Sequence, residues 1–450
     1  MLTDRYNGEH STSDRHAVEA FERAAFEFLA HRPGAGPLLD QALEHDSDHV
    51  SSVALKGFGS VLLARKEHVA TARIFAARAI AAVGARPATG GERALAAALD
   101  KASRGEWLAA ADILQSRLVD QPLDAVALKL AHGLRFLAGD QDGMLAGTAS
   151  VINSWSPSIP GYGFALGCHA FALEEHGHYR AAEQTAKKGL SFEPADVWGL
   201  HAIAHVHTME GRYDDGIAWL TQTSPVWASS NNFTFHLSWH IALLHFSKGE
   251  IGRALELYDR EIRPGLSDDF RDIANAVSLL WRMRQQGIDT RERFAELHAF
   301  ARTRAQDSTL VFASLHHLLT MKACGDCAGV KEILHTINRL ADRQTGDQSS
   351  IASDVGVELA RVIAGLTPNA GAHAEFGRLA RMTSRIGGSN EQRDVFLRTL
   401  ALVAADDGDR AGAESVLAIR HKLKRETHFA GIVAIRIEKG IESQAVREVA

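Results

Sequence analysis

Residues 161–264 carry one pattern three times: AFALEEHGHYRAA at 170–182, AHVHTMEGRYDDG at 204–216 and ALLHFSKGEIGRA at 242–254. In each copy alanine opens the segment, glycine follows at the eighth position, and a second small residue closes it. The copies start 34 and then 38 residues apart. A period of this length is typical of a repeated unit of two helices and two turns. The sequence therefore predicts an all-α protein that is built from helical hairpins.

The same spacing recurs outside this stretch. Gly105 precedes Ala110 by five residues, and Gly408 precedes Ala413 by the same interval. A repeat array adds length without adding domains, because each unit contacts only its neighbours. We therefore expect residues 16–450 to form a single α-solenoid, a superhelix of helical hairpins.

The expected boundaries follow from composition and from one helix-start motif. Residues 1–15 are polar, so we expect a flexible N-terminus. The central repeats are expected at 161–264. Ser389 with Gln392 three positions later is a capping-box pattern, which predicts a helix start and a terminal repeat at about 389–440.

The hairpins resemble tetratricopeptide repeats, with small residues where two helices touch, glycine in the turn, and Pro194 at the end of a unit. In such repeats the first helix of each hairpin lines a concave face, and this resemblance implies which side chains share that face. They are Glu175, Trp198, His201, His205, His236 and Trp239, whereas His240 is expected to lean toward a neighbouring helix. Aromatic walls with a few convergent polar groups are typical of ligand pockets. Because histidine and tryptophan also pack inside helical cores, a purely structural role stays open.

Three motifs make the chain resemble the tetratricopeptide repeat protein 38 family and its bacterial relatives. They are HAIAHVH at 201–207, HLSWH at 236–240 and GGSNEQRDVF at 387–396. The likeness extends over most of the chain. It implies an all-helical solenoid of the tetratricopeptide type, and it does not specify a reaction.

The motif at 387–396 permits two interpretations. Helix starts favour anions, so Gln392, Arg393 and Asp394 could close one end of the concave pocket. Alternatively, the glycine pair and the capping box explain the motif without any ligand.

A metal site is a specific hypothesis for the histidines. His201 and His205 are one helical turn apart, and imidazoles at this spacing can share an ion. With His236 and the carboxylate of Glu175, the set suits zinc, iron or manganese.

An ion with an open coordination position could activate water for attack on an amide or ester. Ala202 follows His201, so the glutamate of a His-Glu-x-x-His metalloprotease is missing. The base would then be Glu175, its neighbour Glu174, or Asp394. A metal-free enzyme would use His205 as the general base, oriented by Glu175.

Two classes of function remain, and ligand binding is the leading one. We expect a small molecule or a short peptide to bind in the pocket rich in histidine and tryptophan. The polar residues are concentrated in two or three units, which favours a small molecule over a long peptide track. The alternative is a hydrolase-like enzyme, dependent on a metal or on histidine, that uses the same pocket.

Composition excludes several other classes. The net charge of −6 is not what a protein that binds nucleic acid through its overall charge would carry. No apolar run reaches the ~18 residues of a membrane span. The N-terminus lacks an apolar signal region, so we expect a cytoplasmic protein. The sequence leaves the oligomeric state open, including a homo-oligomer.

Overall fold

The computed structural model is all-α, as the repeats predict. It describes residues 1–366, 373–426 and 428–449, with the backbone alone at 373, 374 and 440–449. Within these residues the only strands are β1 (Leu2–Thr3) and β2 (Glu9–His10), which pair antiparallel. No described helix has the length and apolar character that a membrane span requires.

The chain divides into two compact units. The first unit comprises Met1–Val206, Ala218–Leu237 and Thr345–Asp347, and the second comprises His207–Ile217, Ser238–Gln344 and Gln348–Ala450. Four of the five boundaries between the units fall inside helices, namely α11 (Val197–Met209), α12 (Tyr213–Gln222), α14 (Phe233–Ser247) and α20 (Asp347–Ile351), and the fifth lies between Gln344 and Thr345.

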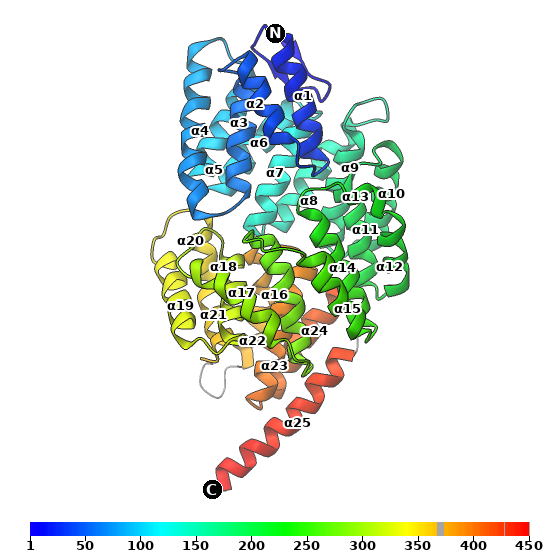
Figure 1. The fold of residues 1–450 in the computed structure, drawn as a ribbon, viewed down its shortest axis with the longest axis vertical. Coiled ribbons are helices and arrows are strands. Elements are labelled where there is room, and N and C mark those ends of the chain that lie inside the picture. The colour runs from blue at the N-terminus through cyan, green and yellow to red at the C-terminus, as the bar shows by residue number, and fades with distance from the viewer. Residues whose placement is uncertain (367–372, 427, 450) are drawn as a thin grey trace. The chain divides into compact units, whose positions relative to one another are not determined.

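The first unit contains successive helices that pack against their neighbours in the chain; α3 lies beside α4 and α9 beside α10 (Figure 1). Its other helices are α1 (Arg15–Leu29), α2 (Ala35–His45), α3 (Val50–Leu62), α4 (Lys66–Ala85), α5 (Gly90–Ser103), α6 (Trp107–Asp120), α7 (Ala125–Ala138), α8 (Gln141–Val151), the 3-10 helix η1 (Ile152–Ser154), α9 (Tyr162–Glu175), α10 (Tyr179–Phe192) and α13 (Ser224–Trp227).

The second unit contains α15 (Ile251–Leu257), the π-helix η2 (Tyr258–Ile262), α16 (Phe270–Gln285), α17 (Arg291–Thr303), α18 (Val311–Ala323), α19 (Cys327–Ala341), the π-helix η3 (Ala352–Gly356), α21 (Val357–Ala364), α22 (His373–Met382), the 3-10 helix η4 (Thr383–Ile386), α23 (Asn390–Asp406), α24 (Arg410–Leu423) and α25 (His428–Val449). The predicted capping box at the start of α23 is confirmed, because Ser389 and Gln392 bond reciprocally to each other's backbone N–H.

One turn recurs between the helices. Glycines with a positive φ occur at 105, 139, 177, 211, 249, 287 and 325, at intervals of 34 or 38 residues. The residue after each glycine donates its N–H to a carbonyl five residues earlier, as His178 does to Leu173 at 2.9 Å. This bond and the left-handed glycine define a Schellman ending of the first helix. The predicted turn glycines Gly177, Gly211 and Gly249 are thus confirmed.

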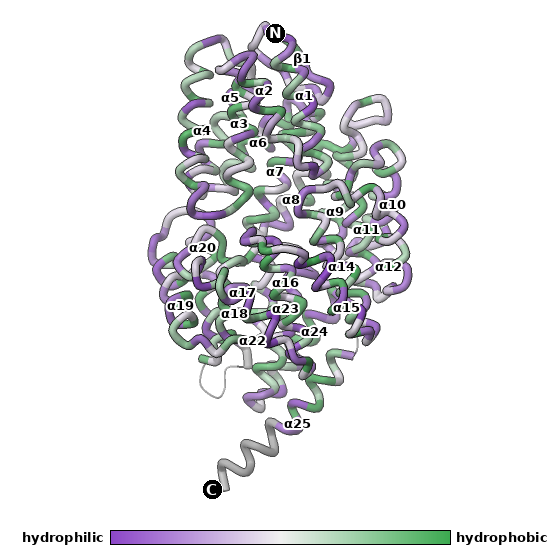
Figure 2. The backbone as a smooth tube through the Cα atoms, in the orientation of Figure 1, coloured by the Kyte–Doolittle hydropathy of each residue, from purple (hydrophilic) through white to green (hydrophobic). Residues whose placement is uncertain are grey.

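Small residues allow the helices of a hairpin to approach closely. A Cβ atom on Gly163 in α9 would lie 2.8 Å from the carbonyl oxygen of Gly189 in α10, so only glycine fits there. Hydrophobic and hydrophilic residues alternate along most helices (Figure 2), as expected for helices with one buried face. In α9 nearly every side chain is buried, whereas α10 buries only three residues.

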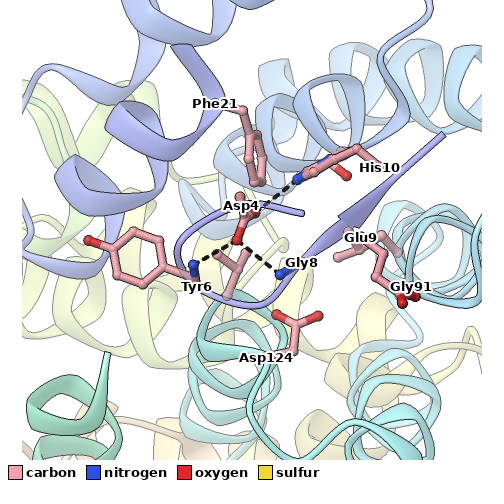
Figure 3. Close-up of a pocket in the computed structure, with 11 residues that line it drawn as sticks. Asp4, Tyr6, Gly8, Glu9, His10, Phe21, Gly91 and Asp124 are labelled. Carbon is pink, nitrogen blue, oxygen red and sulfur yellow. Dashed lines mark hydrogen bonds and ion pairs between the residues drawn. The ribbon is translucent and has the colours of Figure 1, made fainter. Parts of the chain in front are cut away.

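The first fifteen residues differ from the flexible tail that we expected. Asp4 accepts hydrogen bonds from the backbone N–H groups of Tyr6 at 2.7 Å and Gly8 at 2.9 Å (Figure 3). Its other oxygen lies 2.9 Å from Nε2 of His10, and the side chains of Tyr6 and His10 are buried. Polar residues therefore give this segment a defined turn, because Asp4 bonds to the backbone of Tyr6 and Gly8 and to the side chain of His10.

Candidate functional site

Three helices carry the candidate site, and each is the first helix of a hairpin. Helix α9 ends with Glu174 and Glu175, α11 carries His201 and His205, and α14 carries His236 one turn after its start. These five residues all belong to the first unit. These residues lie close together because successive hairpins pack on one another and bring their first helices side by side.

The start of α11 is fixed by Asp196. Its carboxylate accepts hydrogen bonds from the backbone N–H groups of Trp198 at 3.2 Å and Gly199 at 3.1 Å. Burial raises the pKa of Asp196 to about 7. Gly167 in α9 leaves the space that this carboxylate occupies, because a Cβ atom there would collide with it. The cap orients the helix that presents His201 and His205.

Three imidazoles form a buried group within the first unit. His201, His205 and His236 each offer a ring nitrogen, and these nitrogens lie within 4.8 Å of one another. His240 follows His236 by one turn of α14 and belongs to the second unit. Nε2 of His201 and Nε2 of His236 are 3.0 Å apart, and the rings of His201 and His205 have centroids 4.2 Å apart. None of the four side chains is more than 8% exposed.

This spacing fits a single metal ion. Tetrahedral zinc with imidazole ligands at about 2.0–2.1 Å requires neighbouring nitrogens to lie about 3.4 Å apart. The separation of 3.0 Å between His201 and His236 is close to that value, and the outer limit of 4.8 Å allows small rotations of the remaining ring. The group therefore has the donor atoms and the size of a transition-metal site.

Two carboxylates adjoin the histidines. Oε2 of Glu174 lies 3.1 Å from Nδ1 of His205, whereas Oε1 of Glu175 lies 4.0 Å from the same nitrogen. Gln141 in α8 donates its side-chain N–H to Oε2 of Glu175 at 2.6 Å. Both glutamates are buried, and with His205 they form a second group that could hold a metal ion. The site thus joins neutral nitrogen donors to a pair of acidic groups.

Aromatic rings surround the histidines within the first unit. Phe171 stacks on His201 with centroids 5.7 Å apart, and Phe233 lies 5.1 Å from the same ring. Trp198 also contacts His201, as expected for a wall residue, at 5.4 Å. The half-buried ring of His31 stacks on Trp198 and Phe233 and covers their outer side. These rings separate the nitrogen donors from solvent.

Trp239 belongs to the second unit. Its side chain is completely buried in the second unit, and its indole N–H donates to the hydroxyl of Ser278 at 3.1 Å. The guanidinium of Arg282 lies 5.9 Å from its ring. Within the second unit Trp239 thus has structural partners, and a place on a pocket wall stays a prediction for this residue.

Gln392, Arg393 and Asp394 also have structural partners in the second unit. The side chain of Gln392 completes the capping box with Ser389. Arg393 donates to the carbonyl of Gly388 and, at 2.7 Å, to the side chain of Asn390. These bonds support the interpretation of the motif as a helix cap.

Asp394 is paired with arginine. Nε of Arg420 donates to Oδ1 of Asp394 at 2.6 Å, and Arg282 lies 3.7 Å from Oδ2. Burial alone would raise the pKa of Asp394, but Arg420, Lys424 and Arg282 outweigh it and hold this pKa well below its usual range. These ion pairs give Asp394 a structural role in the second unit, and its role as a catalytic base stays a prediction.

Within the first unit the structure therefore brings together four of the predicted residues, His201, His205, His236 and Glu175, with Trp198 at their border. Sequence reasoning did not single out His31, which follows α1 and has no spacing relation to the others. It named Glu174 only as one of three alternative bases, although its place beside Glu175 was a usable signal. No known protein family has a model that matches this sequence.

Proposed function

We propose that this chain is a helical-repeat protein of the tetratricopeptide type that binds a divalent transition-metal ion at its buried histidine group. The recurring Schellman turn, and motifs that resemble those of the tetratricopeptide repeat protein 38 family, support the repeat assignment. The observation that carries the metal assignment is the 3.0 Å separation of Nε2 of His201 and Nε2 of His236 inside a group of three buried imidazoles of the first unit.

The mixture of side chains in the group suits a transition-metal ion. Glu174 and Glu175 are both buried beside the imidazoles, and the two carboxylates with His205 form a group that could hold a metal ion. Imidazole and carboxylate together suit zinc, iron or manganese, and nitrogen-rich sites favour zinc or iron over magnesium and calcium.

A hydrolase-like reaction is the second candidate, and Glu175 is the observation that favours it. This carboxylate lies next to the proposed ion and is held by Gln141 at 2.6 Å, so it could accept a proton from a water molecule on the metal. The surrounding aromatic rings and the burial of the histidines suit a small molecule better than an extended peptide.

Elemental analysis of the purified full chain tests the proposal. Cells are grown with zinc, iron and manganese, and the wild type is compared with a His201→Ala/His236→Ala variant. The matched control is His176→Ala, because His176 adjoins the end of α9 but pairs with Asp142 at the surface.

We expect about one equivalent of one metal in the wild type and in the control, and none in the double variant, on the four-ligand stoichiometry of a single site. A wild-type protein that contains no metal, and that shows no heat of binding when titrated with zinc, iron(II) or manganese(II), would refute the proposal.

A further inference from the structure

We infer that Glu174 is a positioning residue: it holds a proton on Nδ1 of His205 and thereby makes Nε2 of His205 the nitrogen that faces the ion. The inference rests on the proposed function for its ion. The position of the proton, however, can be measured in the metal-free protein, so the two proposals can fail separately.

The geometry distinguishes the two neighbouring glutamates. The distance of 3.1 Å from Nδ1 of His205 to Oε2 of Glu174 is that of a hydrogen bond, and the distance of 4.0 Å to Glu175 is not. In the proposed arrangement the carboxylate of Glu174 accepts the hydrogen bond, which assigns the shared proton to the imidazole. Neutral imidazole carries its proton on one nitrogen and a lone pair on the other. A proton on Nδ1 therefore leaves the lone pair on Nε2.

Burial of His205 and Glu174 stabilises the tautomer with the proton on Nδ1. The side chains of His205 and Glu174 are both 0% exposed. In such surroundings water does not compete for the hydrogen bond, and the low local dielectric strengthens a bond to a charged acceptor. The tautomer of His205 is then fixed before any ion arrives, and the ring needs no rearrangement when it binds.

Glu175 has a different partner. Its Oε2 accepts a hydrogen bond from Gln141 at 2.6 Å, which ties it to α8. The sequence favoured Glu175 as the residue that orients His205, and the geometry favours Glu174. Because the two glutamates are adjacent, equal in charge and both buried, each is the natural control for the other.

A carboxylate behind a ligating histidine has a known chemical effect. It fixes the ring orientation and makes the metal-facing nitrogen a better donor, and losing such a partner typically costs about 10–100-fold in metal affinity. Glu174 would fix the ring of His205 and make its Nε2 a better donor to the ion. His201, the other histidine of α11, would lack this support, since its Nε2 faces Nε2 of His236 instead of a carboxylate.

The first experiment is nitrogen-15 NMR of the full chain, labelled at histidine and freed of metal with a chelator. The His205 signals are assigned with a His205→Gln variant. We expect wild-type His205 to carry its proton on Nδ1. We expect the proton to shift toward a mixture of tautomers in Glu174→Leu, which removes the acceptor, and to stay on Nδ1 in Glu175→Leu. Glu174→Gln retains an acceptor oxygen and is expected to restore the wild-type tautomer in part.

The second experiment adds cadmium-113 as a zinc-like probe. Coupling between cadmium and Nε2 of His205 supports the inference, and the cadmium affinity of Glu174→Leu should fall about 10–100-fold. A wild-type proton on Nε2, coupling through Nδ1, or an unchanged tautomer in folded Glu174→Leu would each overturn it. If Glu174→Leu does not fold, the wild-type tautomer alone decides. If no metal binds while the proton lies on Nδ1, the proposed function fails and the role of Glu174 stands.

Discussion

Replacement of Asp394 by asparagine should destabilise the protein substantially, because Asp394 is central to a buried ionic cluster of the second unit. The cluster consists of four cations, Arg282, Arg398, Arg420 and Lys424, and three carboxylates, Glu391, Asp394 and Glu426. Asp394 contacts Arg420 at 2.6 Å and Arg282 at 3.7 Å. The side chains of these three residues are at most 4% exposed, so solvent screens their charges little.

The expected magnitude follows from this burial. Breaking a buried ion pair by removing one partner costs about 3–5 kcal/mol, because the remaining charge stays uncompensated. The cluster already has one more cation than carboxylates, and asparagine raises this excess to two. Since asparagine keeps one acceptor oxygen for the guanidinium of Arg420, we expect a loss of about 3 kcal/mol, at the lower end of that range.

The effect should also depend on pH. Arg420, Lys424 and Arg282 hold the pKa of Asp394 well below its usual range despite burial, so the folded state keeps this carboxylate ionised in mild acid. The stability it contributes is complete above the unfolded pKa of about 3.9 and is lost as the pH falls from there through the folded pKa. The difference between wild type and Asp394→Asn should therefore be constant from pH 7 to 5 and should shrink below about pH 4.

Urea unfolding followed by circular dichroism measures this difference, and Asp406→Asn is the matched control. Asp406 lies in the same helix and pairs with Arg436 at 2.8 Å, but its side chain is 52% exposed. An exposed pair contributes only about 0–1 kcal/mol. If Asp394→Asn were as mild as Asp406→Asn, the reasoning from burial would be refuted and Asp394 would again be open to a role in binding.

Other perturbations test the turns, the ion and the N-terminal network. Gly249→Ala should cost about 1 kcal/mol, because φ is +81° there, whereas Gly252→Ala, in a helix with open space beside it, should be neutral or stabilising in the same urea experiment. Zinc at a hundred times its Kd should stabilise the wild type by about 2.7 kcal/mol in calorimetric scans and should leave His201→Ala/His236→Ala unchanged. Burial, and then His10, lower the pKa of His49 to about 3, so only the unfolded chain takes up this proton between pH 6.5 and 3. Stability should fall with decreasing pH by up to about 1.4 kcal/mol per unit from His49, and urea titrations of His49→Gln should lack that part of the slope.

The helical hairpins could be predicted because their signal is local. Gly177 and Gly211 mark a left-handed turn that few other residues adopt, and the turn needs only the last residues of one helix. The pairing of His201 with His205 is equally local, since one helical turn fixes it. The meeting of His201 with His236 depends on how one hairpin packs on the next, and the repeat resemblance was needed to foresee it.

Other features required partners far away in the sequence. The capping box at Ser389 was evident, but the carboxylate of Asp394 is neutralised by Arg420 and Arg282, 26 and 112 residues away. Helical position put Trp239 on the stripe expected to face the concave side, but it could not tell whether that stripe meets a pocket or another helix. Polarity suggested a loose N-terminus because composition does not reveal that Asp4 closes its own turn.

The carboxylates and histidines of the site stand on α9, α11 and α14, which belong to three successive hairpins. In repeat proteins, each hairpin is held chiefly by its neighbours, so a stretch of the array can open while the rest stays folded. An ion held by all three helices would act as a cross-link between segments more than sixty residues apart, from Glu174 to His236. These hairpins would then open together or not at all, and amide hydrogen exchange in α9 would slow when metal is bound to histidines on α11 and α14.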